Sequence, residues 1–153
     1  MALACTFAGG AFSQSGFTNQ DFRGTYAYSF EGTLIRVSTN TPIPVVALGT
    51  FTLDGEGKVT KAVRHINVGG QLVRETATGT YSVGPDGVGT ATFIVIPLAG
   101  EPPVVPPTRE VFHVVFRDRQ RGFGISSTIR AADGTDIGFV SLIRTEFVRQ
   151  DIP

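Results

Sequence analysis

Residues 71–97, QLVRETATGTYSVGPDGVGTATFIVIP, decide the expected fold. Two runs rich in Thr, Val, Tyr, Phe and Ile flank Gly84-Pro85-Asp86-Gly87. Such runs favour strands, and Pro followed by Asp and Gly is typical of a tight turn because Pro presets φ and Gly accepts a positive φ. The stretch therefore predicts a β-hairpin.

The remainder of the chain follows the same plan of a strand-forming run, a turn with Gly or Asp, and another run. In residues 24–31, for example, Tyr26, Tyr28 and Phe30 share one face of the predicted strand. No window of 12 residues shows helical periodicity. Eight strands are predicted, at residues 24–37, 45–54, 58–67, 71–83, 88–97, 109–118, 123–131 and 136–148.

Eight antiparallel strands joined in sequence have two economical arrangements, a closed up-and-down barrel and a two-sheet β-sandwich. Short hairpins favour the barrel, and closure removes the edges on which such chains aggregate. We therefore predict an all-β fold, an antiparallel up-and-down barrel of about eight strands, with the sandwich as the alternative. Residues 21–153 are expected to form this single domain.

Composition limits the classes of function. The chain has 153 residues, of which 41% are hydrophobic and 17% charged, as in globular domains. Its 13 basic and 13 acidic residues cancel, so nucleic acid is not an expected partner, because phosphate backbones require surplus positive charge. Cys5 is the only cysteine, which excludes an intrachain disulfide, and no run of 18 apolar residues predicts a transmembrane segment.

Residues 1–20 carry no charged side chain. Two interpretations fit them: a remnant of a signal peptide that starts upstream of Met1, or an uncharged tail of the mature protein that docks on the barrel or on a neighbour. The first predicts a secreted or periplasmic protein, and the second allows a cytoplasmic one.

Some predicted strands are apolar on both faces. Phe93 and Val95 share one face of the fifth strand, while Ile94 and Ile96 share the other. A strand with water on one side should alternate with polar residues. The tail, the Pro-rich residues 97–107 or a second subunit could cover the outer face. We expect a homo-oligomer built on the fifth, sixth and eighth strands.

The sequence Phe22-Arg23-Gly24-Thr25-Tyr26 resembles the Gly-x-Trp motif of lipocalins, with Tyr in place of Trp. In that resemblance, Arg144 on the last strand is the basic residue that packs over the aromatic ring. The strand number is also similar to that of the allene-oxide-cyclase-like barrel, so the resemblance is to a calycin-type barrel. The recurring GTY and DGxG motifs resemble those of uncharacterised secreted bacterial proteins.

No motif for a metal, cofactor or nucleophile is present. His65 and His113 are the only histidines and have no metal-ligand spacing, and no G-x-S-x-G sequence occurs. Ionisable residues are nevertheless scattered through the predicted strands, and an eight-stranded barrel can hold one small ligand. The residues predicted to line such a cavity are Tyr26, Tyr28, His65, Glu75, His113, Arg130 and Arg144.

Three functions remain open. The first is binding of a small apolar ligand inside the barrel. The second is a structural or assembly role through the tail and the outer apolar strands. The third is a cofactor-free isomerase or cyclase, in which a buried His or Glu acts as acid or base. A cavity above about 300 Å³ favours the first and third. A core packed solid with side chains, together with a tail lying on another subunit, favours the second.

Overall fold

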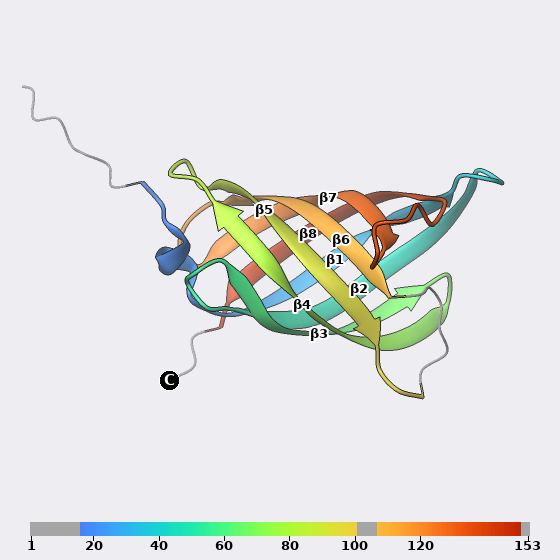
Figure 1. The fold of residues 1–153 in the computed structure, drawn as a ribbon, viewed down its shortest axis with the longest axis horizontal. Helices are drawn as coiled ribbons and strands as arrows, with labels where there is room; N and C mark the ends of the chain where they lie inside the picture. The colour runs from blue at the N-terminus through green and yellow to red at the C-terminus, as the bar shows by residue number, and fades with distance from the viewer. Residues whose placement is uncertain (1–15, 101–106, 151–153) are drawn as a thin grey trace, which may run out of the picture.

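The computed structural model describes residues 16–100 and 107–150. It is a closed antiparallel barrel in which each strand pairs with the next and the eighth returns to the first (Figure 1). The prediction of an all-β up-and-down barrel is confirmed. The strands are β1 (Gly24–Arg36), β2 (Thr41–Leu53), β3 (Lys58–Val68), β4 (Gln71–Val83), β5 (Val88–Pro97), β6 (Thr108–Phe116), β7 (Arg121–Ala131) and β8 (Phe139–Arg149).

The barrel closes along a long ladder between β1 and β8, which runs from the pair Tyr26–Arg149 to the pair Arg36–Phe139. The hairpin of β4 and β5 forms as predicted, with Val83 opposite Gly89 and Gly87 at φ 80° in the turn. By contrast, β7 pairs with β8 only over Arg121–Ile125, which is the shortest strand pairing in the barrel.

The second strand begins four residues earlier than the sequence indicated. It was predicted to start at residue 45, yet β2 starts at Thr41 and includes Pro42 and Pro44. The two prolines lie two residues apart, so their missing N–H groups face the same side, and β3 pairs with β2 only from Val45 onwards. Proline is tolerated where a strand has an unpaired edge.

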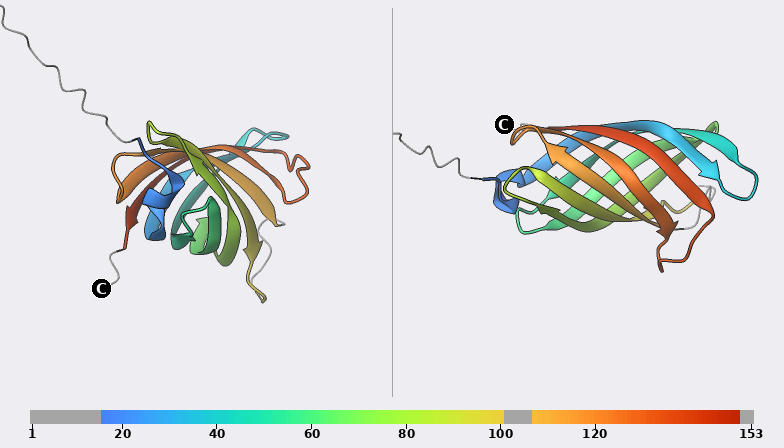
Figure 2. Two further views of the ribbon diagram at one scale, coloured as in Figure 1. Left: turned by 60° about the vertical axis from the view of Figure 1, so that its left-hand side comes forward. Right: turned by 90° about the horizontal axis from the view of Figure 1, so that it is seen from above.

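A short 3₁₀ helix, η1 (Asn19–Phe22), lies across one end of the barrel (Figures 1 and 2). Phe22 is completely buried, and its ring centroid lies 3.8 Å from that of Phe116. The Tyr81 hydroxyl donates a hydrogen bond of 3.0 Å to the Asn19 carbonyl oxygen. Asn19 and Gln20, which were predicted to belong to the tail, are therefore part of η1, which we call the plug because it covers this end of the barrel. Residues 1–15 of the predicted tail lie outside the described residues.

The outer wall carries many exposed apolar side chains. They occur on β5, β6 and β8, as the sequence indicated, and also on β2, β4 and β7, which it did not. Among the larger ones are Val46, Leu48, Ile96, Val115, Phe123, Ile125, Val140 and Leu142. No helix in the described part of the chain is long and apolar enough to cross a membrane.

Candidate functional site

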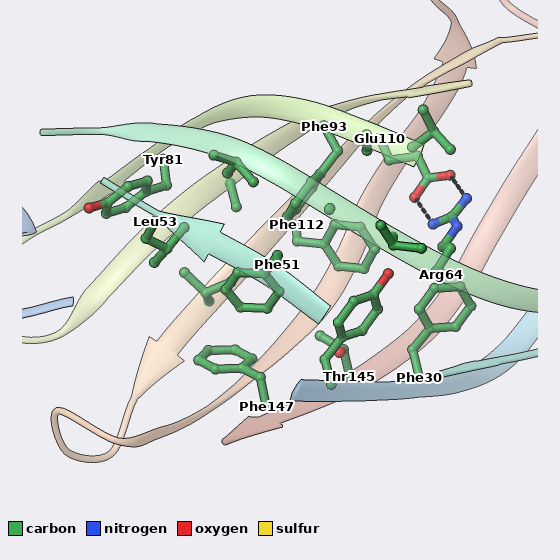
Figure 3. Close-up of a pocket in the computed structure, with 18 of the residues that line it drawn as sticks. Phe30, Phe51, Leu53, Arg64, Tyr81, Phe93, Glu110, Phe112, Thr145 and Phe147 are labelled. Carbon is green, nitrogen blue, oxygen red and sulfur yellow. Dashed lines mark hydrogen bonds and ion pairs between the residues drawn. The ribbon is translucent and has the colours of Figure 1, made fainter. Parts of the chain in front are cut away.

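The barrel interior contains an apolar cavity, which we call the interior cavity. It holds about 60 Å³ of free space, room for roughly four water-sized groups. Side chains from β1 to β6 and β8 line it, because alternate residues of each strand point inward (Figure 3). They include Tyr28, Phe30, Phe51, Ala62, Arg64, Glu75, Ala77, Tyr81, Phe93, Val95, Glu110, Phe112, Thr145 and Phe147.

Aromatic rings form most of the cavity wall. Phe51 lies at the centre of this cluster, with ring centroids 6.3 Å from Phe93 and 5.8 Å from Phe147, both in edge-to-face geometry. Phe93 in turn meets Phe112 edge-to-face at 6.0 Å. Phe51 and Phe93 point inward yet are only half-buried, because their rings border the free space.

Three buried charged residues end the cavity on the side away from η1; we call them the Arg64 cluster. The guanidinium of Arg64 on β3 donates two hydrogen bonds, of 2.8 and 2.7 Å, to the carboxylate of Glu110 on β6. Its Nε donates at 2.5 Å to Oε2 of Glu75 on β4. Arg64 is 7% exposed, Glu75 3% and Glu110 4%. Figure 3 shows the fork between Arg64 and Glu110 at the edge of the aromatic cluster.

The Arg64 cluster is further held by its neighbours. The Thr108 hydroxyl donates to Glu110 Oε1 at 3.2 Å. Oε1 therefore accepts from both Thr108 and Arg64, and Oε2 accepts from Arg64. The Arg64 guanidinium also lies 5.4 Å from the centroid of the Phe30 ring, a cation–π contact. These contacts fix Arg64 and Glu110 in one geometry.

Burial and the facing charges shift the pKa values of the Arg64 cluster. Two carboxylates face one guanidinium, which leaves one surplus negative charge when all three groups are ionised. Burial raises the pKa of Glu75; Arg64 opposes this shift, and the negative charge of Glu110 adds to it. Burial by itself would lower the pKa of Arg64, but the two carboxylates raise it above its usual value. Burial also raises the pKa of Tyr28 to about 12.

A second cavity, of about 30 Å³, lies on the far side of the Arg64 cluster. Its wall is mostly aliphatic and includes Leu34, Val68 and Ile137, together with Phe139, near the end of the barrel opposite η1. Arg64, Glu75 and Glu110 border both cavities. The cluster therefore divides the barrel interior into two compartments.

The structure brings together two of the seven site residues predicted from the sequence. Tyr28 and Glu75 line the interior cavity. Tyr26 points inward but packs among other rings, stacked on Phe51 at 5.3 Å, and is not in the cavity wall. The other four lie exposed on the outside of the barrel, because each occupies an outward position of its strand: His65, His113, Arg130 and Arg144.

The basic residue beside Tyr26 also differs from the prediction. Arg144 is exposed and pairs with Glu146. The position opposite Tyr26 on β8 belongs to Arg149, whose positive charge opposes the effect of burial on the pKa of Tyr26. Arg149 packs against Gly24, where a Cβ would lie 2.9 Å from its Nε.

Sequence reasoning missed Arg64 and Glu110 as site residues. The signal for both was strand alternation. Glu110 lies two residues before Phe112, on the buried row of β6 that also contains Val114 and Phe116. Arg64 lies between Ala62 and Ile66 on the inward row of β3. A charged residue in an otherwise apolar row indicates a buried ion pair.

The described residues contain no group of three His, Cys, Asp or Glu side chains that could hold a metal ion. Searches against protein-family models and curated proteins gave no match. Among solved structures, the chain is similar to one described as EF1p2_mFAP2b bound to DFHBI, with a TM-score of 0.51 and 12% sequence identity. The match covers 90% of this chain and 100% of the other, and it shows a common fold.

Proposed function

We propose that the protein binds a compact apolar molecule in the interior cavity. The observation that carries the proposal is free space walled by Phe51, Phe93, Phe112 and Phe147 and ended by the Arg64 cluster. Small-molecule sites in proteins have this composition, with mostly apolar walls and a few well-placed polar groups that orient the ligand.

The interior cavity, at about 60 Å³, is smaller than the roughly 300 Å³ expected of a site for a drug-sized molecule, and this restricts the proposed ligand to a very small one. About 60 Å³ accommodates roughly four or five non-hydrogen atoms without movement of the walls. Burying such a molecule is favourable because each square ångström of apolar surface removed from water contributes about 25 cal/mol. The barrel of similar fold that is described as bound to DFHBI supports the proposal, since it shows that this architecture can hold a small molecule.

Xenon is a suitable first probe because it is spherical and apolar and enters dry protein cavities. We expect xenon to shift the NMR signals of the methyl groups of Ala77 and Val95, which line the cavity. Filling the space with Ala77→Leu should abolish the shift at the methyl groups of Val95. Thr78→Leu is the matched control, because Thr78 is the exposed neighbour on the outer face of β4.

Saturable shifts at the cavity methyl groups that persist in Thr78→Leu and disappear in Ala77→Leu would support the proposal. Absence of any shift at these groups in the unmodified chain would contradict it. Equal shifts in both variants would place xenon elsewhere and would contradict it as well.

A second candidate is assembly with other copies through the outer wall. The observation that favours it is a group of exposed apolar side chains on neighbouring strands: Val46 and Leu48 on β2, and Val140 and Leu142 on β8, with β1 between them. Exposed apolar side chains gathered on neighbouring strands favour an interaction site. Light scattering should then give a mass above the 16.3 kDa of one chain, reduced by Leu48→Lys with Leu142→Lys. A single-chain mass for the unmodified protein would contradict this candidate.

A further inference from the structure

One oxygen of the Arg64 cluster has no hydrogen-bond donor among the residues that the structure describes. Glu75 Oε2 accepts from Arg64 Nε, whereas within the described ranges no donor reaches Glu75 Oε1. No side-chain nitrogen or oxygen of the described residues is both sealed from solvent and unpartnered. Oε1 of Glu75, a residue only 3% exposed, therefore borders free space inside the barrel.

The cluster also lacks one positive charge. Glu110 is matched by the two-pronged hydrogen bond from Arg64, so the surplus negative charge resides on Glu75. The groups that face Glu75 are Arg64 from β3, Glu110 from β6 and Tyr28 from β1, and only Arg64 is cationic. A buried carboxylate without its own counter-charge is costly, and either a proton or a cation relieves that cost.

We propose that the ligand of the interior cavity is a small amine whose ammonium group binds Glu75 Oε1 while its apolar body lies among Phe51, Phe93 and Phe112. This inference rests on the function proposed above and names the chemical class of the ligand. The ammonium group supplies both the missing donor and the missing charge.

Ammonium binding and protonation compete at the Glu75 carboxyl group, because each supplies one positive charge beside it. Burial raises the pKa of Glu75, and an ammonium ion at Oε1 opposes that shift by stabilising the carboxylate. A Glu75 carboxyl group that carries a proton releases it to water when the ammonium ion enters, so one cation enters and one proton leaves. An ionised Glu75 binds the ammonium ion without proton release.

Two probes of five non-hydrogen atoms separate charge from shape. Isobutylammonium and isopentane are nearly isosteric, with an ammonium group in place of one methyl group. Each is titrated at pH 7 into the full chain, with NMR shifts of the cavity methyl groups as the readout. The variants are Glu75→Gln and, as a matched control, Glu31→Gln, which alters an exposed carboxylate on the outer face of β1.

We expect Glu75→Gln to weaken isobutylammonium binding at least tenfold relative to its effect on isopentane, because the charged partner of the ammonium is lost. Glu31→Gln should leave the ratio of the two dissociation constants unchanged. In the unmodified chain, isobutylammonium should also lower the titration midpoint of the Glu75 carboxyl carbon, and isopentane should not. This second readout does not depend on the folding of a variant.

The outcomes distinguish the two proposals. If isopentane binds but Glu75→Gln leaves the ratio unchanged, or the Glu75 midpoint does not move with the amine, the amine is the wrong ligand class and the apolar cavity function stands. If neither probe shifts the cavity signals, the proposed function itself fails, and the amine proposal fails with it.

Discussion

Replacing Arg64 by Met should destabilise the barrel by about 3–5 kcal/mol at neutral pH. The substitution leaves Glu75 and Glu110 buried, 3% and 4% exposed, without a cationic partner. It removes three charge-assisted hydrogen bonds while the side-chain volume is nearly conserved. Urea unfolding followed by circular dichroism at pH 7 measures the loss, and a domain of this size has about 5–15 kcal/mol to lose.

Arg144→Met is the control for removal of an arginine charge. The ion pair of Arg144 with Glu146 is open to water, with 65% and 50% of the two side chains exposed, so its loss should cost less than about 1 kcal/mol. The triple change Arg64→Met, Glu75→Leu and Glu110→Leu should recover most of the stability, because apolar groups can replace a buried ionic cluster. A cost for Arg64→Met no larger than that of Arg144→Met would refute the buried cluster.

Three further predictions concern pH, strand contact and the plug. Because burial holds the pKa of Glu75 above its ordinary value of 4.5, its contribution to stability is present below that pH and is lost as the pH rises through the raised pKa. Between pH 4 and pH 8, the unfolding free energy of Glu75→Gln should therefore rise relative to that of the unmodified chain. A difference between the two that does not change with pH would contradict the raised pKa of Glu75. At Gly79 a Cβ would lie 1.9 Å from the Thr92 carbonyl oxygen, so Gly79→Ala should cost about 1–3 kcal/mol and lower the Tm; an unchanged Tm would show that the two strands are farther apart. Removal of the fully buried Phe22 ring in Phe22→Ala should cost about 3 kcal/mol in urea unfolding, and a cost under about 1 kcal/mol would show that η1 does not close the barrel.

Most of the fold could be predicted from local sequence because its determinants are local. The Gly84-Pro85-Asp86-Gly87 turn and the alternating runs on both sides fix a hairpin, and short connections throughout allow few arrangements other than a meander. The early start of β2 was missed because the tolerance of Pro42 and Pro44 depends on where β3 stops pairing, which is a tertiary fact.

The site was predicted less well than the fold, and the reason lies in the strand faces. His65 and His113 were predicted to line the cavity because their side chains are ionisable. Each, however, lies between two inward-facing neighbours on its strand, so its own side chain faces outward. The two-residue period places Glu75 and Glu110 inside with equal certainty. What no single strand reveals is that residues 64, 75 and 110 come to one level of the barrel, because this depends on the register of four consecutive strands.

The most direct test of the account is a crystal structure of the protein under xenon pressure. One strong xenon peak is expected in the interior cavity, against the Phe51 and Phe93 rings and on the η1 side of Arg64. An interior without xenon, together with peaks only on the outer wall, would contradict it.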